Sequence, residues 1–201
     1  TKRRKITNLF PWFFLFILLI FSSVYFSDYF RKVTEKLAAS ITSDEQESNL
    51  GNMMFSEISG VSYCDIKKVN DYIHSSDKNY LSTASRNIEL IFINLKKDSS
   101  ILFPGGKLLV PYSILEEKDG VFKLVEITKE AKKALKNKKA IRKFFSDQTN
   151  KSLLIYIFGN FTHLNFDKDN GFSISLDGRP EAFDKGFTNK KWLKLKKICK
   201  L

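Results

Sequence analysis

Apolar residues gather first in an uncharged run from Ile6 to Ser27, which follows four basic residues at positions 2–5. A bilayer's hydrocarbon core is crossed by about 20 mostly apolar residues, so this run is long enough to span it. A cleaved signal peptide is the alternative interpretation. Signal peptides, however, have a shorter apolar stretch of about 7–15 residues and a small-residue cleavage site, and no clear site of that kind follows here. The pattern therefore predicts an uncleaved anchor, and the basic residues before it predict a cytoplasmic N-terminus with the remainder outside.

Beyond the run, Val33, Leu37, Ala38 and Ile41 recur at helical spacing, which predicts that the anchor helix continues past the membrane. The next residues, 42–60, are mostly polar and are expected to form a linker. The predicted organisation is then a short basic tail over residues 1–8, an anchor helix with its continuation over 9–41, the linker over 42–60 and one extracytoplasmic domain over 61–201.

Periodicity within the domain predicts a helix that starts near Asp65 and a largely buried strand over 88–95. Asp119-Gly120 and Asn170-Gly171 each stand between apolar runs and favour hairpin turns. The remaining expected elements are a helix capped by Thr128 that runs to about Phe145, a strand over 153–158 and a helix over 188–199. This order predicts an α+β domain with a mostly antiparallel sheet and flanking helices.

Composition makes the chain strongly basic, with 34 Lys and Arg against 22 Asp and Glu among 201 residues, a formal charge of +12. In the cytoplasm such a balance would favour nucleic acid. Outside the cytoplasm the anionic partners become lipid headgroups, envelope polymers or acidic protein surfaces. We therefore expect other membrane or envelope proteins and the bilayer as partners, a homo-oligomer as a further option, and no nucleic acid. The alternative is an ordinary lysine-rich solvated surface.

Two basic helices are the candidates for such contacts. The contact with an anionic partner is assigned to Lys132, Lys136, Lys139 and Lys143. A contact with the membrane surface is assigned to Trp192 and Leu195 with Lys194 and Lys197, because an aromatic residue flanked by lysines is typical of helices at that interface. A solvated face and a helix packed on the sheet are the respective alternatives.

The chain carries two cysteines, Cys64 and Cys199, and an extracytoplasmic compartment permits them to form a disulfide. Two free thiols are the alternative, because the sequence does not show whether they meet. Two scattered histidines and two cysteines do not make a zinc site, and the spacing after Asn165 does not fit an EF-hand. We therefore expect no metal, no cofactor and no catalytic residues.

These features predict a non-enzymatic, single-pass subunit of a larger membrane or envelope complex, whose outer domain acts in protein–protein assembly. The architecture, without any shared motif, is similar to inner-membrane assembly subunits of secretion and conjugation machines. A bacterial inner membrane facing the periplasm is the expected location, with the mitochondrial inner membrane as the alternative. A holin-type lysis or pore-forming protein and an extracytoplasmic sensor or ligand-binding module are the competing functions, and an enzyme ranks below them.

Overall fold

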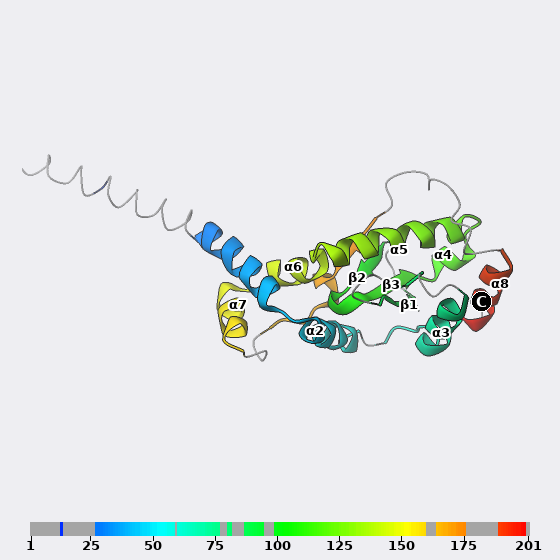
Figure 1. The fold of residues 1–201 in the computed structure, drawn as a ribbon, viewed down its shortest axis with the longest axis horizontal. Coiled ribbons are helices and arrows are strands. Elements are labelled where there is room, and N and C mark those ends of the chain that lie inside the picture. The colour runs from blue at the N-terminus through cyan, green and yellow to red at the C-terminus, as the bar shows by residue number, and fades with distance from the viewer. Residues whose placement is uncertain are drawn as a thin grey trace, which may run out of the picture.

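The computed structural model describes residues 13, 27–58, 60–76, 80–81, 87–94, 99–159, 164–175 and 189–199. They form a mixed α+β domain around a four-stranded sheet (Figure 1). The predicted anchor falls outside this set except at Phe13 and Ser27. None of the helices in these ranges is both long enough and apolar enough to cross a membrane.

The sheet is mixed, and its strand order is β1-β3-β2-β4. The strands are β1 (Glu89–Ile93), β2 (Ser100–Leu102), β3 (Lys107–Pro111) and β4 (Phe172–Ile174). β1 lies within the strand expected over 88–95. It pairs with β3 in parallel, whereas β2 pairs with β3 and with β4 in antiparallel fashion. Two of the three pairings in this sheet are antiparallel, in agreement with the predicted mostly antiparallel sheet, and the β1–β3 pairing is parallel.

Helices cover both faces of this sheet. They are α2 (Asp44–Ser56), α3 (Ile66–Ser76), α4 (Ser113–Glu116), α5 (Gly120–Lys136), α6 (Lys139–Ser146), α7 (Asn150–Ile157) and α8 (Asn189–Ile198), with short 3-10 turns η1 (Pro104–Gly106) and η2 (Lys168–Asn170). The chain is also helical over 27–41. The helices expected from Asp65 and over 188–199 are thus present as α3 and α8.

Alternate residues of the strands point into two separate cores. Leu90 and Phe92 of β1 join residues of α3, α4, α5 and α8 in one buried cluster. Ile93 and Leu109 point the other way and pack with α2, α6, α7 and two alanines of the helix over 27–41. This division follows the two-residue period of side chains in a strand.

The expected linker over 42–60 is instead occupied by α2, so that prediction is wrong for most of its length. Ser43 and Gln46 form a capping box at the start of α2, each side chain bonding the other residue's backbone N–H. Leu50 and Met54, one helical turn apart, are fully buried. Gly51 lies so close to η1 that a Cβ there would stand 2.0 Å from the Pro104 carbonyl oxygen. α2 is therefore part of the packed domain.

The hairpin predicted around Asp119-Gly120 is also wrong, because Gly120 begins α5. The run after it is helical, since Leu124, Ile127 and Ala131 are buried at spacings of three and four residues. Thr128, predicted as a helix cap, lies inside α5, where its hydroxyl donates to the Leu124 carbonyl oxygen at 2.8 Å.

The single helix expected over 128–145 is divided between α5 and α6. Lys138 between them has a φ of 53°, in the left-handed region, and this interrupts the helix. Both helices keep a buried apolar stripe, so the predicted amphipathic pattern is present on two elements instead of one.

Two further expectations fail near the C-terminal part of the domain. Residues 153–158 were expected as a strand but belong mainly to α7, whose first turn is capped by the Thr149 side chain accepting from the Ser152 N–H at 3.1 Å. The second hairpin is absent from the described part of the chain, since β4 pairs with β2 and residues 164–167 are not a strand. The predicted partner residues 161–163 lie outside the described ranges.

The elements give the domain two distinct ends (Figure 1). The helix over 27–41 and α7 lie at one end, and α3 and α8 lie at the other. The residues nearest to the predicted anchor therefore meet the domain at the α7 end, far from the C-terminal helix.

Candidate functional site

The helix over 27–41 is docked on the domain through one face. Thr34, Ala38 and Ala39 on that face are buried, with at most 4% of their surface exposed. The two alanines belong to the core cluster that contains α6 and α7. Their small side chains allow the helix backbone to lie close to the domain, as small residues do at other helix–helix contacts.

Two basic side chains fasten this helix to α6. Arg31 donates through Nη2 to the carbonyl oxygen of Ser146, the last residue of α6. Lys138, just before α6, donates through Nζ to the carbonyl oxygen of Ala39 at 3.1 Å. The order of these contacts makes the two helices antiparallel, and each cation meets carbonyls at the other helix's C-terminus, where positive charge is favoured.

A buried polar cluster closes the same junction. The Thr42 hydroxyl donates to the Ala38 carbonyl oxygen at 2.6 Å, so the Tyr156 hydroxyl at 2.7 Å donates to Thr42. The Glu47 side chain is buried nearby, and its Oε1 accepts from the Gly105 N–H at 3.4 Å. Burial raises the pKa of Tyr156, the bond with Thr42 opposes that rise, and the charge of Glu47 adds to it. The cluster thus fixes α2 and α7 against the end of the N-terminal helix.

The other face of the N-terminal helix is uncovered. Its apolar side chains Phe30, Val33, Leu37 and Ile41, here called the exposed stripe, are 48%, 44%, 44% and 47% exposed. Val33, Leu37 and Ile41 were predicted from their helical spacing as one apolar face with Ala38, and the structure leaves these three exposed while it buries Ala38 against the domain. An apolar row on a docked helix is thus left open to the surroundings.

α7 adds a second uncovered apolar feature at this end of the domain. Leu154 and Phe158 are one helical turn apart, and Phe158, the C-terminal cap residue of α7, is 86% exposed. These two residues are called the α7 pair. In the same helix Leu153 and Tyr156 are buried, so one face of α7 belongs to the core while the pair projects from it.

The four lysines predicted to contact an anionic partner divide between two helices. Lys132 and Lys136 lie on α5, and Lys139 and Lys143 lie on α6. Lys139 stands over the Phe172 ring, 5.6 Å from its centroid, and Lys143 pairs with Asp147 at 2.7 Å. Lys136, Lys139 and Lys143 are exposed and Lys132 is half-buried. The structure therefore does not place them on one continuous helix.

The membrane-surface contact predicted for α8 is wrong for its apolar residues. Trp192 and Leu195 are buried in the core with α3 and β1, leaving 6% and 0% of their surface exposed. Lys197 is exposed, and Lys194 stands over the Tyr72 ring at 4.9 Å. The apolar face of α8 thus packs on the domain, and Leu193 alone of its large apolar residues is exposed.

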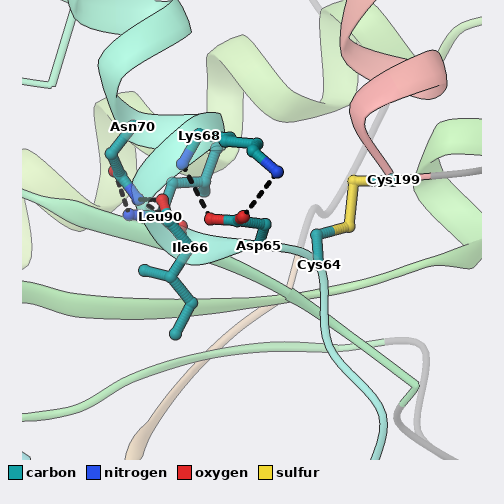
Figure 2. The surroundings of a disulfide bond; sticks show 7 residues. All are labelled: Cys64, Asp65, Ile66, Lys68, Asn70, Leu90 and Cys199. Carbon is teal, nitrogen blue, oxygen red and sulfur yellow. Dashed lines mark hydrogen bonds and ion pairs between the residues drawn. A yellow bond between two sulfur atoms is a disulfide. The ribbon is translucent and has the colours of Figure 1, made fainter.

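Cys64 and Cys199 form a disulfide, which is the bridged form of the two alternatives (Figure 2). It joins the segment before α3 to the end of α8 across 135 residues of sequence. Beside it the Asp65 carboxylate accepts from the Lys68 N–H at 3.0 Å and pairs with the Lys68 ammonium. That backbone hydrogen bond is the main cause of a lowered pKa for Asp65.

The β1 edge near this end is closed by side chain and backbone contacts. Asn70 bonds both the N–H and the carbonyl oxygen of Leu90 at 2.8 Å (Figure 2). Tyr63 forms an isolated antiparallel bridge with Ile93. These contacts take up backbone groups of Leu90, Phe92 and Asn94 along this edge of the sheet.

Of the junction, the sequence indicated only the apolar positions Val33, Leu37, Ala38 and Ile41. The signal for α2 was available in Ser43 and Gln46, whose spacing is that of a capping box. The contacts of Arg31 and Lys138 join residues about a hundred positions apart, and no local pattern indicates them.

No group of three or more His, Cys, Asp or Glu side chains arranged to hold a metal is present in the described ranges. Comparison with protein-family models, with characterised proteins and with solved structures found no match. The function is therefore argued from this chain's own surfaces.

Proposed function

We propose that this chain is a non-enzymatic, single-pass membrane-anchored subunit of a larger envelope or membrane complex. Its domain, outside the cytoplasm, acts in assembly. One observation carries the proposal: apolar side chains stay uncovered on two elements at the end of the domain that adjoins the predicted anchor. These are the exposed stripe and the α7 pair.

Exposed apolar area of this kind is typical of interaction surfaces. Single exposed apolar residues are ordinary on soluble proteins, whereas rows and clusters of them mark sites for a partner. Here they occur at regular helical spacing on helices whose other faces are already buried. The domain does not need these side chains for its own core, so a partner is the simplest reason for them.

The docked junction supports an assembly role as well. Arg31 and Lys138 hold the N-terminal helix to α6, and the Thr42–Tyr156 hydrogen bond holds α7 to its end. A domain tied in this way keeps a set orientation relative to the segment that leads to the anchor. The α7 pair would then be presented to neighbouring subunits at a defined distance from the membrane.

The disulfide supports placement of the domain outside the cytoplasm, because disulfides persist in oxidising compartments and are rare in the cytosol. The positive residues before the apolar run favour the same orientation. A reporter enzyme that works only outside the cytoplasm should accordingly be active when fused after Leu201. A reporter active in the cytoplasm would refute the orientation.

The assembly role is tested by purifying the full chain in mild detergent and identifying the proteins that accompany it. Replacing the α7 pair, Leu154→Ser with Phe158→Ser, should remove those proteins while the circular dichroism spectrum stays unchanged. Leu193→Ser is the matched control, because Leu193 is also an exposed apolar residue of a helix but lies at the opposite end. Wild-type protein that purifies alone, or equal losses in both variants, would refute the proposal.

A further inference from the structure

We infer that the exposed stripe binds the same stripe of a second copy of this chain, as a parallel pair of helices just outside the membrane. The inference rests on the membrane anchor of the proposed function and names one partner of the subunit. The stripe comprises Phe30, Val33, Leu37 and Ile41, which run along about 16 Å of helix at ~1.5 Å per residue.

Lipid is not a suitable cover for these side chains. The helix over 27–41 carries the charged residues Asp28, Arg31, Lys32, Glu35 and Lys36. Each charge at the bilayer centre costs about 2.5–3.5 kcal/mol on insertion scales, so this segment lies beyond the hydrocarbon region. An apolar stripe on it faces water unless a protein covers it.

The chain's own domain does not cover the stripe either. It already occupies a neighbouring face of the helix through Thr34, Ala38 and Ala39, and the bonds of Arg31 and Lys138 hold that arrangement. Successive residues turn by about 100° around a helix, which places positions 30, 33, 37 and 41 together on a separate arc. A second protein chain is therefore required.

The spacing and the anchor indicate that this second chain is another copy. Positions 30, 33 and 37 follow the three-four alternation of the a and d positions of a parallel coiled coil, and Ile41 lies one turn further. None of the four stripe positions is charged, so identical stripes meet without repulsion.

The chain that precedes the stripe gives the pairing its direction. Positions 1–26 lie before the described helix, and the apolar run within them is long enough to cross the bilayer and ends where the helix begins. Two copies inserted the same way leave the membrane at the same residue. Their stripes are then parallel and in register, which is the self-complementary arrangement of a two-fold dimer.

Single-cysteine cross-linking in intact membranes tests this pairing on the full chain. Both native cysteines are held in the disulfide, so an introduced cysteine is the free thiol of the protein. Val33→Cys and Leu37→Cys should each give disulfide-linked dimers on mild oxidation. Lys32→Cys is the matched control, because Lys32 is exposed on the same helix but outside the stripe, and its dimer yield should be several-fold lower.

Equal yields from stripe and control cysteines, no dimer from either stripe cysteine, or a cross-link from the stripe to a different protein would each overturn the inference. Retention in alkali-washed membranes and the proteins that accompany the wild-type chain are measured on the same preparations. A chain that is anchored and keeps its partners but forms no stripe dimer refutes only the pairing. A chain that washes out of the membrane refutes the proposed function.

Discussion

Replacing Leu50 with Ala tests whether α2 is part of the packed domain, as the structure shows, or a linker, as its polar composition suggests. Leu50 is fully buried in the cluster that contains Met54, Phe144 and Leu153. The substitution removes three carbon atoms, about 2.4 kcal/mol of lost burial at ~0.8 kcal/mol each. A residual cavity adds to this, so we expect a loss of about 3–4 kcal/mol in the free energy of unfolding.

The loss is measured by urea or thermal unfolding of the full chain in detergent, followed through the fluorescence of Trp192, which is buried in the other core. A Trp12→Phe background removes the second tryptophan of the chain. At about 2–4 °C per kcal/mol for a chain of this size, the midpoint should fall by roughly 6–15 °C.

Met53→Ala is the control, because Met53 is the neighbouring long apolar residue of α2 but is 44% exposed. Its effect should be small beside that of Leu50→Ala. If both variants stay within about 0.5 kcal/mol of wild type, α2 does not pack on the domain and the argument from burial is refuted.

Three other outcomes are expected. Replacing Cys64 and Cys199 with Ser should lower the free energy of unfolding by roughly 2–5 kcal/mol, because the bridge closes a 135-residue separation. Reductant should cause the same loss in the wild-type protein and no further loss in the double variant, as unfolding measured with and without reductant would show. Asp65→Ala should lower stability at neutral pH. The pKa of Asp65 is lowered in the folded state, so the stability difference between wild type and this variant should shrink as the pH falls below about 4 and through the folded-state pKa. Urea unfolding midpoints of both proteins at several pH values would show this. Changing Lys132, Lys136, Lys139 and Lys143 to Gln should shift stability by about 0.5 kcal/mol or less per residue. If these lysines bind an anionic partner, less of that partner should co-purify with the variant than with wild type, and the amount that co-purifies with wild type should fall as the salt concentration rises.

Helix α3 was predicted correctly because Ile66, Val69 and Ile73 recur at helical spacing. β1 has no such period, and its short apolar run suits a strand covered on both faces. The α8 helix, like α3, was found from its apolar spacing. Its buried face was assigned to the membrane instead of the domain, because periodicity shows that a face is apolar but does not show what covers it.

Short apolar runs account for most of the errors. Residues 121–127 and 153–157 fit a strand and a buried helix equally well, since fewer than eight residues do not separate the two periods. In both places the decision lies in contacts made elsewhere. Leu124 and Ile127 belong to the first core, and Leu153 belongs to the second core together with Phe144 and Leu50. Tertiary burial overrides local pattern at these positions.

The candidate site shows the same limit in a different form. The spacing of Val33, Leu37, Ala38 and Ile41 predicted one apolar helix face, and the structure divides it: the three larger side chains are exposed, whereas Ala38 is buried with Thr34 and Ala39. The sequence did not show that these small residues, with less apolar surface, form the face that docks. Small residues form the docked face because they let the helix backbone lie close to α6 and α7, whereas bulkier side chains would hold the backbone further away.

This division of faces leaves the larger apolar side chains uncovered, which is what the proposed assembly role requires. In the proposed pairing, one face of the helix docks on its own domain and another face binds a second chain. The docked face is fixed by hydrogen bonds from Arg31 and Lys138 to carbonyl oxygens, which do not depend on apolar area. The apolar area is then free to stabilise association, which gains most from burying it. If the proposed pairing forms, Arg31 and Lys138 would contribute to it indirectly, by holding the helix that carries the stripe in place.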